Sequence, residues 1–501
     1  MQTTPASAAP SSPASLSPRD RSVITLLLVS AFVVILNETV LSVALPPIMD
    51  DLRITETTAQ WLTTGFMLTM AVVIPITGFL MGRFSTRQVF ALAMTTFTVG
   101  TLICAVSPTF LPLLLGRIVQ ASGTAVMMPL LMTTTMNLVP PARRGRTMGN
   151  ISIVIAVAPA IGPTISGLIL SFAPWRFLFV AVLPIAIAAL LLGLRRIENV
   201  QESHAIPADI ISVVLSGIGF GTLVYGLTGI SGGHAASASA GSGVPLAAIV
   251  CLVIGVVSLT IFVLRQLRLQ KVERALLDLR TFASRNFTVA VVLMVVMMGS
   301  MFGTIVILPI FLQRVLDLPT LTVGLMMLPG GLLQGLAAPL VGRLFDRVGP
   351  RPLIVPGLLA VTAGIAVLSR VPEQPWMIVA GHVVMSLGLA FIFTPLFTTA
   401  LGSLPRPLYA HGSAIVGTVQ QVAGAAGAAL MVSIMSRISL RTIDGGGTAA
   451  EGISRGTSFA FTICVALALV TVAIALFVRR APEEADPAPA AEDVELAGPR
   501  A

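Results

Sequence analysis

Fourteen apolar stretches, each long enough to cross a lipid bilayer as a helix, dominate this sequence. A hydrocarbon core of about 30 Å requires roughly 20 apolar residues in helical conformation. Inside a membrane the backbone has no water to bond, so such stretches must satisfy their own hydrogen bonds as helices. The chain is therefore predicted to be an all-α integral membrane protein. The predicted spans are 22–45, 59–82, 88–107, 110–139, 147–171, 175–194, 210–230, 245–265, 287–312, 320–342, 352–369, 376–402, 411–436 and 457–478.

Composition agrees with a polytopic membrane protein. Of the 501 residues, 55% are hydrophobic and only 10% are charged, which lies outside the range of soluble domains. The net charge of +9 would suggest nucleic acid in a soluble chain, but here the arginines lie between apolar stretches, so the expected partner is the lipid bilayer and not nucleic acid. The three cysteines and four histidines are scattered without ligand spacing, so neither a disulfide framework nor a metal site is predicted.

The basic residues predict the orientation of the chain. Cytoplasmic loops of membrane proteins carry an excess of Lys and Arg. With both termini in the cytoplasm, most of the 30 Lys and Arg fall on the inner side, including the groups at 143–146, 195–196, 265–271 and 343–351. A missed or invented helix would invert every later loop, so the pattern favours fourteen spans. Arginine far outnumbers lysine, which indicates a GC-rich bacterial genome and hence a protein of the bacterial plasma membrane.

An internal repeat divides the spans into two halves. Glycine-arginine turns follow both the second and the tenth span, at 78–87 and 339–351, and a second matching pair lies at 139–146 and 404–412. The offsets are about 260 and about 265 residues, as expected for the duplicated bundles of a transporter. The predicted fold is therefore two six-helix bundles separated by an inserted pair of helices.

The predicted domain organisation follows from this repeat. The tails are rich in alanine, proline and polar or acidic residues and cannot bury a core, so they are expected to be disordered. The stretch 231–243 is expected to be a flexible external loop and 265–285 a cytoplasmic linker. In order, the parts are a cytoplasmic tail at 1–21, the N-terminal bundle at 22–194, two inserted helices with linkers at 195–286, the C-terminal bundle at 287–478 and a cytoplasmic tail at 479–501.

Glu38 is the only carboxylate that falls deep inside any of the apolar stretches. An acid at that depth is costly and is a candidate for function by default. Burial favours the neutral carboxyl form, so Glu38 is expected to bind and release a proton near neutral pH, and a proton and a substrate would compete for it. The alternative is a structural acid that is hydrogen-bonded to a neighbouring helix.

Arg117 is the only arginine well inside a span, and it needs a partner or water there. Glu38, Gln120 and backbone carbonyl groups are the possible partners. We expect Arg117 to tune or relay the proton. The alternative is an interfacial anchor that extends to the external surface, because Arg117 lies close to that end of its helix.

Three further groups of candidates are weaker. A proline next to a glycine should bend the fifth helix, and small residues around it should let another helix approach at a moving interface between the halves; these residues are Ala158, Gly162, Pro163, Ser166 and Gly167. A cytoplasmic gate, or else a merely solvated turn, is expected at Gly342, Arg343, Asp346, Arg347, Gly349 and Arg351. Contacts to hydrophobic or cationic substrates are expected at Glu38, Gln120 and Gln313.

Five short motifs lie in or at the ends of five of the predicted helices. They are 36–46 (LNETVLSVALP), 116–123 (GRIVQASG), 158–167 (APAIGPTISG), 308–313 (LPIFLQ) and 324–330 (GLMMLPG). Together they resemble the motifs of the fourteen-helix drug:proton antiporters of the major facilitator superfamily, the EmrB/QacA type, and the likeness runs from about residue 24 to 478. The sequence LNET in the first motif and the turn at 83–88 look more similar to the lincomycin-resistance exporters within that branch.

The resemblance implies a function. Such proteins export hydrophobic or amphiphilic compounds in exchange for protons by alternating access, with the proton gradient as energy source and without a cofactor. The arginine of the fourth-helix motif, Arg117 here, is implicated in proton transfer, and the fifth-helix motif marks antiporters. One departure matters: the family's cytoplasmic turn carries an aspartate, which is kept as Asp346 in the second half but replaced by Gly82 in the first. The charge latch assigned to that first aspartate cannot form here.

Other functions remain open at this point. The nearest is a dedicated exporter of one endogenous metabolite, such as an antibiotic made by the same cell, which the fold does not distinguish from a multidrug exporter. An enzyme is not expected, because the spans hold no cluster of histidine, cysteine or carboxylate, and the sequence lacks a phosphate-binding Gly-Lys-Ser/Thr motif. A transport-inactive receptor is disfavoured because the tails are short.

Overall fold

The computed structural model describes residues 17–197, 199, 209–230, 246–371 and 374–477. Within these ranges fourteen helices are long and apolar enough to cross a membrane, which confirms the predicted count. The predicted loop 231–243 and most of both predicted tails lie outside the described residues.

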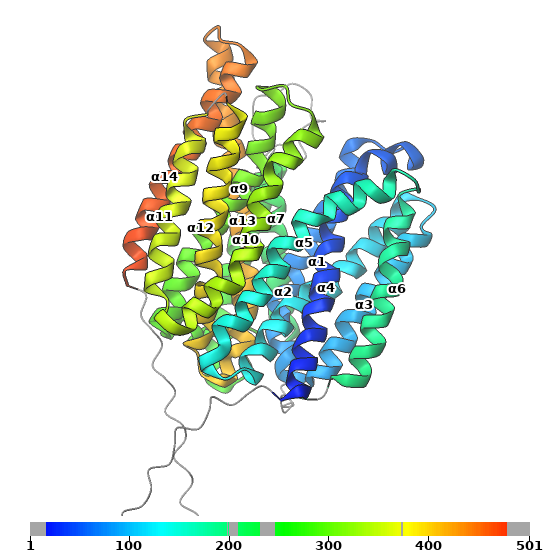
Figure 1. Cartoon of the computed structure of the whole chain (residues 1–501). Helices are drawn as coiled ribbons and strands as arrows, with labels where there is room; N and C mark the ends of the chain where they lie inside the picture. The colour runs from blue at the N-terminus through cyan, green and yellow to red at the C-terminus, as the bar shows by residue number, and fades with distance from the viewer. Residues whose placement is uncertain (1–16, 198, 200–208, 231–245, 372–373, 478–501) are drawn as a thin grey trace, which may run out of the picture.

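The helices form two bundles of six and an additional pair (Figure 1). The first bundle contains α1 (Pro18–Leu52), α2 (Glu56–Arg83), α3 (Thr86–Val106), α4 (Phe110–Leu138), α5 (Arg144–Leu170) and α6 (Arg176–Arg196). The pair is α7 (Ile210–Ile230) and α8 (Leu246–Leu269). The second bundle contains α9 (Arg285–Arg314), α10 (Thr320–Val348), α11 (Arg351–Ser369), α12 (Pro375–Gly402), α13 (Tyr409–Asp444) and α14 (Ala449–Ala475).

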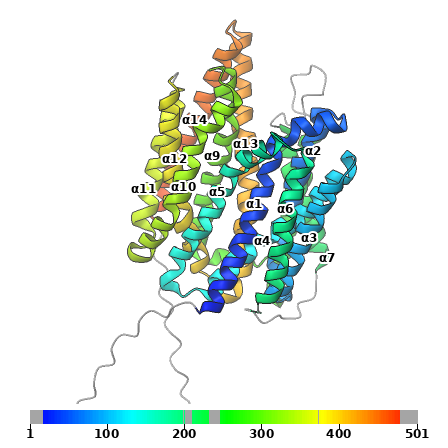
Figure 2. The same ribbon diagram turned by 45° about the vertical axis from the view of Figure 1, so that its right-hand side comes forward.

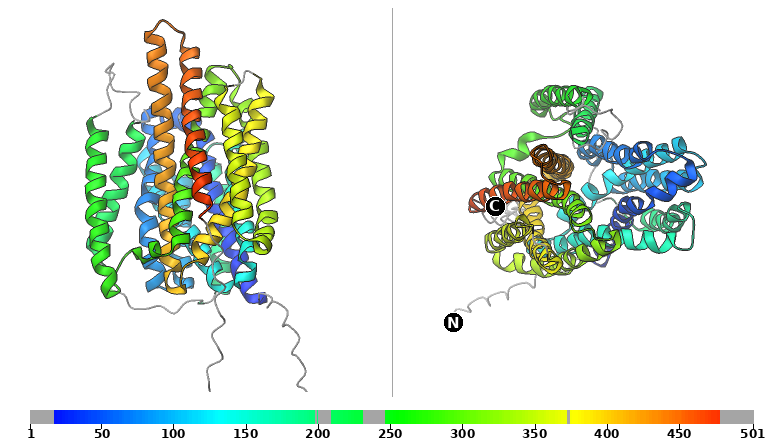
Figure 3. Two further views of the ribbon diagram at one scale, coloured as in Figure 1. Left: turned by 90° about the vertical axis from the view of Figure 1, so that its left-hand side faces the viewer. Right: turned by 90° about the horizontal axis from the view of Figure 1, so that it is seen from above.

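The two bundles lie side by side, and the additional pair packs outside the seam between them (Figures 2 and 3). Helix α7 contacts α2 of the first bundle and α13 of the second. We call the face at which α1 begins and α14 ends the terminal face, and the other face the opposite face. Both bundles run from one face to the other, as duplicated halves of a transporter do.

Several helices are longer than the apolar stretches predicted. Helix α1 begins at Pro18, where the Ser17 hydroxyl accepts a hydrogen bond from the Asp20 N–H at 3.1 Å, so the predicted tail 1–21 is helical at its end. Helix α14 begins at Ala449 instead of 457, behind a capping box between Thr448 and Glu451. Hydropathy marks only the membrane core, whereas polar caps extend helices beyond it.

The hairpin of α13 and α14 projects beyond the other helices on the opposite face, as Figure 3 shows. The two helices approach closely there, because a side-chain carbon at Gly452 would meet the Ser439 backbone carbonyl at 2.8 Å. Gly456 packs in the same way against the backbone of Met435. Glycine at these positions therefore allows close contact between the two helices of the hairpin.

The linker after α8 is folded onto the terminal face. The buried Gln266 side chain donates to Ser212 Oγ at 2.7 Å and accepts from the Leu276 N–H at 2.7 Å. Beside it, Arg265 donates to both carboxylate oxygens of Asp209 at 2.8 Å. The hydrogen bond from Arg265 lowers the pKa of the Asp209 carboxyl to about 2, so this pair stays ionised at physiological pH.

Candidate functional site

Glu38 lies within α1 in the first bundle, and its side chain is partly exposed. In the part of the chain that the structure describes, no hydrogen bond or ion pair to its carboxylate is found. The residue before it, Asn37, is buried at 2% exposure. Glu38 is therefore not the hydrogen-bonded structural acid of the alternative interpretation.

Arg117 of α4 is buried at 1% exposure, which excludes an interfacial anchor. Its Nη1 donates to Gln120 Oε1 at 2.6 Å and to Asn37 Oδ1 at 3.3 Å. The centre of the guanidinium lies 4.0 Å from the centroid of the Phe66 ring, a cation–π contact from α2. The charge of Arg117 also acts on Glu38, although no ion pair joins the two among the described residues.

Gln120 orients this arginine. Its Oε1 accepts from Arg117, and its Nε2 donates to Thr101 Oγ1 of α3 at 2.8 Å. Gln120 is fully buried, with both ends of its amide engaged. The predicted role of Gln120 as a substrate contact gains no support from this position. Gln120 and Thr101 hold the guanidinium of Arg117 beside α1, and we call these two residues the Arg117 bracket.

Close packing of α3 against α4 makes this bracket possible. A side-chain carbon at Gly100 would overlap the backbone of Gln120, and one at Gly116 would meet the sulfur of Cys104 at 2.8 Å. Small residues at such crossings let helix backbones approach within hydrogen-bonding reach of their polar side chains. The glycines of the 116–123 motif therefore let α4 approach α3 closely enough for Gln120, which binds Arg117, to reach Thr101.

The fifth-helix motif packs against α1 next to Glu38. A side-chain carbon at Gly162 would overlap the Thr39 side chain, while Ala158 and Ser166 are fully buried. Gly167, in contrast, has no neighbour within 4 Å of its side-chain position. We expected this stretch at the interface between the halves, and α5 does pack against α10 of the second bundle, although Gly162 itself faces α1. Gly162 fixes α5 to α1 inside one bundle, and the Pro163 side chain lies outside the described residues.

The two bundles meet near the terminal face. Asp346 of α10 accepts hydrogen bonds from the Gly145 N–H at 2.8 Å and the Arg146 N–H at 2.9 Å, so it caps the first turn of α5 across the seam. The hydroxyls of Ser152 and Thr394 lie 2.9 Å apart at the same seam. These bonds hold the terminal face closed.

A second set of contacts across the seam joins α4 and α13. The hydroxyls of Thr133 and Ser413 lie 2.7 Å apart, and the guanidinium of Arg144 lies over the Tyr409 ring at 5.6 Å. Both contacts are on the terminal side of the bundles, so they add to the closure there.

The predicted gate differs in detail from the structure. We expected a turn at Gly342, but α10 continues to Val348 and ends at Gly349, whose φ of +80° favours glycine. Arg343 and Arg347 are exposed. The bonds found for Asp346 go to backbone N–H groups of α5, and Gly342 packs against the backbone of Gly145. In place of the expected turn, α10 continues as a helix and its Asp346 carboxylate caps the N-terminus of α5 across the seam.

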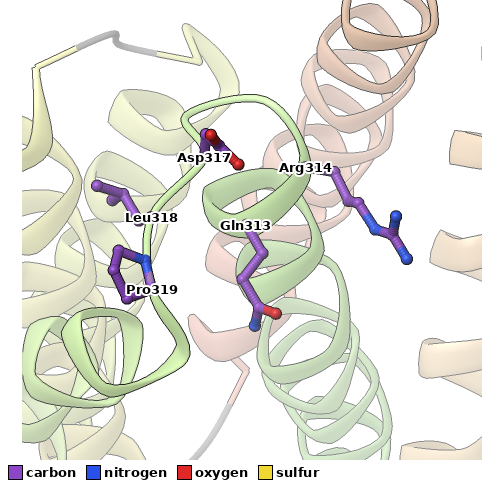
Figure 4. Close-up of a pocket in the computed structure, with 5 residues that line it drawn as sticks. All are labelled: Gln313, Arg314, Asp317, Leu318 and Pro319. Atoms are coloured by element: carbon purple, nitrogen blue, oxygen red, sulfur yellow. The ribbon is translucent and has the colours of Figure 1, made fainter.

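Gln313 lies in the other bundle, at the end of α9 on the opposite face. It lines a pocket of about 540 Å³ with Arg314, Asp317, Leu318 and Pro319 (Figure 4). The structure thus does not bring Gln313 together with the Arg117 bracket. Asn37, Phe66 and Thr101 complete the site instead. Of these, only Asn37 had a signal in the sequence, as a polar residue next to the deep acid.

Comparison with known proteins identifies the family. The model of the Major Facilitator Superfamily matches residues 27–428. An uncharacterised MFS-type transporter of Bacillus subtilis, YcnB, is 38% identical over 477 residues, which cover 94% of this chain and 98% of that protein. The lincomycin resistance protein LmrB of Listeria monocytogenes is 37% identical over 466 residues, covering 92% and 97%. This chain belongs to the major facilitator superfamily, and the predicted resemblance is confirmed.

The fold has solved counterparts. The proton:xylose symporter XylE matches with a TM-score of 0.65 at 14% identity, over 93% of this chain and 97% of that one. At this identity the match shows the fold alone. The protein is thus a multi-pass membrane transporter whose relatives include proteins named for drug resistance.

Proposed function

We propose that this transporter exports hydrophobic or amphiphilic compounds, antibiotics among them, across the bacterial plasma membrane in exchange for protons. Two observations support the proposal. The Glu38 carboxylate has no hydrogen-bonding partner among the described residues, and the buried Arg117, whose charge acts on it, is held by Gln120 and Asn37. The names of the relatives support the substrate class, since LmrB is a lincomycin resistance protein. The arginine distribution supports a cytoplasmic terminal face.

The geometry supplies a mechanism. With the terminal face closed by Asp346, alternating access requires the site to open to the opposite face, so in our proposal Glu38 takes its proton from outside the cell. When Glu38 is protonated and therefore neutral, the positive charge of Arg117 is stabilised by its hydrogen bonds to the neutral side chains of Asn37 and Gln120. When Glu38 gives up its proton, the nearby arginine stabilises the carboxylate, or a cationic substrate replaces the proton. In this mechanism the substrate and the proton bind alternately at the Glu38 carboxylate.

The driving force is adequate. One charge moved across 100 mV is worth about 2.3 kcal/mol, so roughly 150 mV sustains about a three-hundredfold gradient of a neutral compound per electrogenic proton. No ATP-binding motif is needed.

The test is substrate-driven proton movement. Purified protein in proteoliposomes that contain a pH-sensitive dye is given candidate lipophilic antibiotics under an imposed pH gradient. We expect each transported compound to move protons in the opposite direction. Transport at the same rate with no proton movement would refute the exchange, and susceptibility profiling in a pump-deficient host identifies the compounds to use.

Orientation has its own test. In a variant without the three native cysteines, a single cysteine at Lys271 on the terminal face or at Asp444 on the opposite face is exposed to labelling. A membrane-impermeant thiol reagent applied to intact cells should label the cysteine at position 444 and not that at 271. Labelling of position 271 from outside would overturn the proposed orientation.

The cap on α5 predicts the effect of Asp346→Asn. The asparagine amide keeps only one accepting oxygen and loses the negative charge at the start of α5, which should weaken closure of the terminal face by about 0.3–1 kcal/mol. Spin labels at the exposed positions Arg87 and Arg406, one in each bundle, should then show a larger share of long distances by pulsed electron resonance. Arg347→Gln removes an exposed neighbouring charge and is the matched control. Equal distance distributions in both variants would remove Asp346 from the gate.

A further inference from the structure

The fourth helix of each bundle carries a related pattern. Residues 116–123 read GRIVQASG and residues 381–388 read GHVVMSLG, with glycines at both ends. Arg117 lies 7 residues after the first residue of α4 (117 − 110 = 7), and His382 lies 7 residues after the first residue of α12 (382 − 375 = 7). The sequence thus pairs a buried arginine in one bundle with a histidine in the other.

Helix contacts confirm this pairing. A side-chain carbon at Gly123 of α4 would meet the Ala93 carbonyl and the Phe97 nitrogen of α3. The equivalent carbon at Gly388 of α12 would meet the Gly357 carbonyl and the Val361 nitrogen of α11. The partners differ by the same offset (357 − 93 = 264 and 361 − 97 = 264). The α3–α4 and α11–α12 crossings are therefore the same, and His382 occupies the place of Arg117.

The neighbour on the facing helix is also matched. Phe66 of α2 covers Arg117, and Gly330 of α10 abuts the imidazole of His382 at the same offset (330 − 66 = 264). A side-chain carbon at Gly330 would lie 2.6 Å from Cε1 of His382 and 2.7 Å from Ser386 Oγ. At the place where the first bundle has the Phe66 ring next to Arg117, the second bundle has Gly330 next to the titratable ring of His382.

The imidazole is buried and incompletely bonded. His382 is 7% exposed, and among the described residues its Nδ1 has no hydrogen-bond partner. A neutral imidazole has one nitrogen that accepts, and no hydrogen bond to either nitrogen of His382 is found among the described residues, so the lone pair of its accepting nitrogen is free. Leaving such a group unsatisfied is costly and indicates a role in some other state of the protein.

Charges around His382 are sparse. The helices that pack against α12 are α5, α9, α10, α11 and α13. Most of their acidic and basic residues stand near the helix ends, such as Arg146, Arg314 and Asp346, while the exposed Arg437 lies seven residues before the end of α13 (444 − 437 = 7) and α12 itself contains none. No carboxylate or cation of the described residues acts on His382. An imidazolium in the closed packing would therefore lack any compensating charge.

We propose that His382 is a second proton-binding site, the counterpart in the second bundle of Arg117, and that it takes up its proton when α10 moves off it. This inference rests on the proposed proton-coupled export. Water that enters between α10 and α12 carries an excess proton, as hydronium, to the free lone pair of the imidazole, so that imidazolium forms and neutral water remains. When α10 packs back onto the ring, the proton returns to water. Imidazole is suited to this exchange because it titrates near physiological pH.

Gating and protonation are linked through α10. The helix that abuts His382 at Gly330 also carries Asp346, which closes the terminal face. A movement of α10 that breaks the cap on α5 therefore also changes the surroundings of His382. Protonation of His382 should in turn favour the arrangement in which the cap is broken, because linkage is reciprocal.

The direct experiment is a titration of the histidine side chains. Protein with ¹⁵N-labelled histidine in lipid is followed by solid-state NMR from about pH 5 to 8, the range in which imidazole changes charge. The sequence has four histidines, so His382→Asn assigns the signal by its loss. We expect His382 to become protonated in this range, and to do so to a larger extent in Asp346→Asn. A ring that stays neutral throughout in both proteins would overturn the proposal.

A measurement of protons released on substrate binding separates this inference from the proposed function. In detergent, the protons released per substrate bound should fall by about one in His382→Asn, as linkage requires for the loss of one site. Ser386→Ala changes the neighbouring hydroxyl but keeps the imidazole, so it should release as many protons as the wild type. Equal release by His382→Asn and the wild type would show that the second site is not coupled. If the wild type releases none, proton-coupled export fails, while the NMR titration still decides whether His382 binds a proton.

Discussion

Replacing Glu38 by glutamine is expected to abolish proton-driven, uphill export while leaving binding of a neutral substrate intact. Glutamine has nearly the shape of the protonated acid but cannot release a proton. Since Glu38 has no bonding partner among the described residues, the substitution breaks no contact that holds the fold. Any loss of transport then reports the missing proton exchange. The measurement is substrate-induced proton movement in proteoliposomes under an imposed pH gradient.

Two controls make the Glu38 result specific. Glu38→Asp keeps a titratable group and should retain partial activity, with a shifted pH optimum because the shorter side chain has different surroundings. Cationic substrates should lose more affinity in Glu38→Gln than neutral ones, because we propose that the carboxylate pairs with them. Wild-type coupling in Glu38→Gln would remove this residue from the mechanism.

Arg117→Ala should reduce coupled export by about tenfold to a hundredfold, a loss of roughly 1.4 to 2.8 kcal/mol. The substitution removes the charge that acts on Glu38 and leaves Asn37 Oδ1 and Gln120 Oε1 without their donor. It also removes the cation–π contact with Phe66, which is worth about 0.5–2 kcal/mol. The rate of substrate-driven proton release measures the effect, with membrane insertion checked by the amount of protein purified.

Arg117→Lys separates charge from geometry. Lysine keeps the positive charge but lacks the planar fork that reaches Gln120 and Asn37 together. We therefore expect proton release between that of Arg117→Ala and that of the wild type. If Arg117→Ala exports as fast as the wild type, the bracket of Gln120 and Thr101 serves packing alone.

Much of the fold was predictable because membranes impose simple rules. The fourteen spans follow from the cost of exposing backbone to hydrocarbon, and Glu38 and Arg117 stand out because charges are costly there. The repeat offset, read from cytoplasmic segments, reappears in the helix crossings at Gly123 and Gly388.

The partners of the site residues were not predictable in the same way. Which face of a helix meets a neighbour depends on rotation about its axis, and hydropathy does not fix that rotation. Phe66 and Thr101 therefore carried no signal, although Phe66 contacts Arg117 and Thr101 belongs to the Arg117 bracket. The same holds for the partners of Asp346, because they are backbone N–H groups, which every residue except proline possesses.

The long hairpin of α13 and α14 has a practical consequence. It stands clear of the bundles on the opposite face, and its helices are joined through Gly452 and Gly456 (Figure 3). An antibody fragment raised against this tip would be held in a fixed direction relative to the second bundle. Bound there, it would serve as an alignment marker for single-particle imaging of a protein whose other mass is hidden in a detergent micelle.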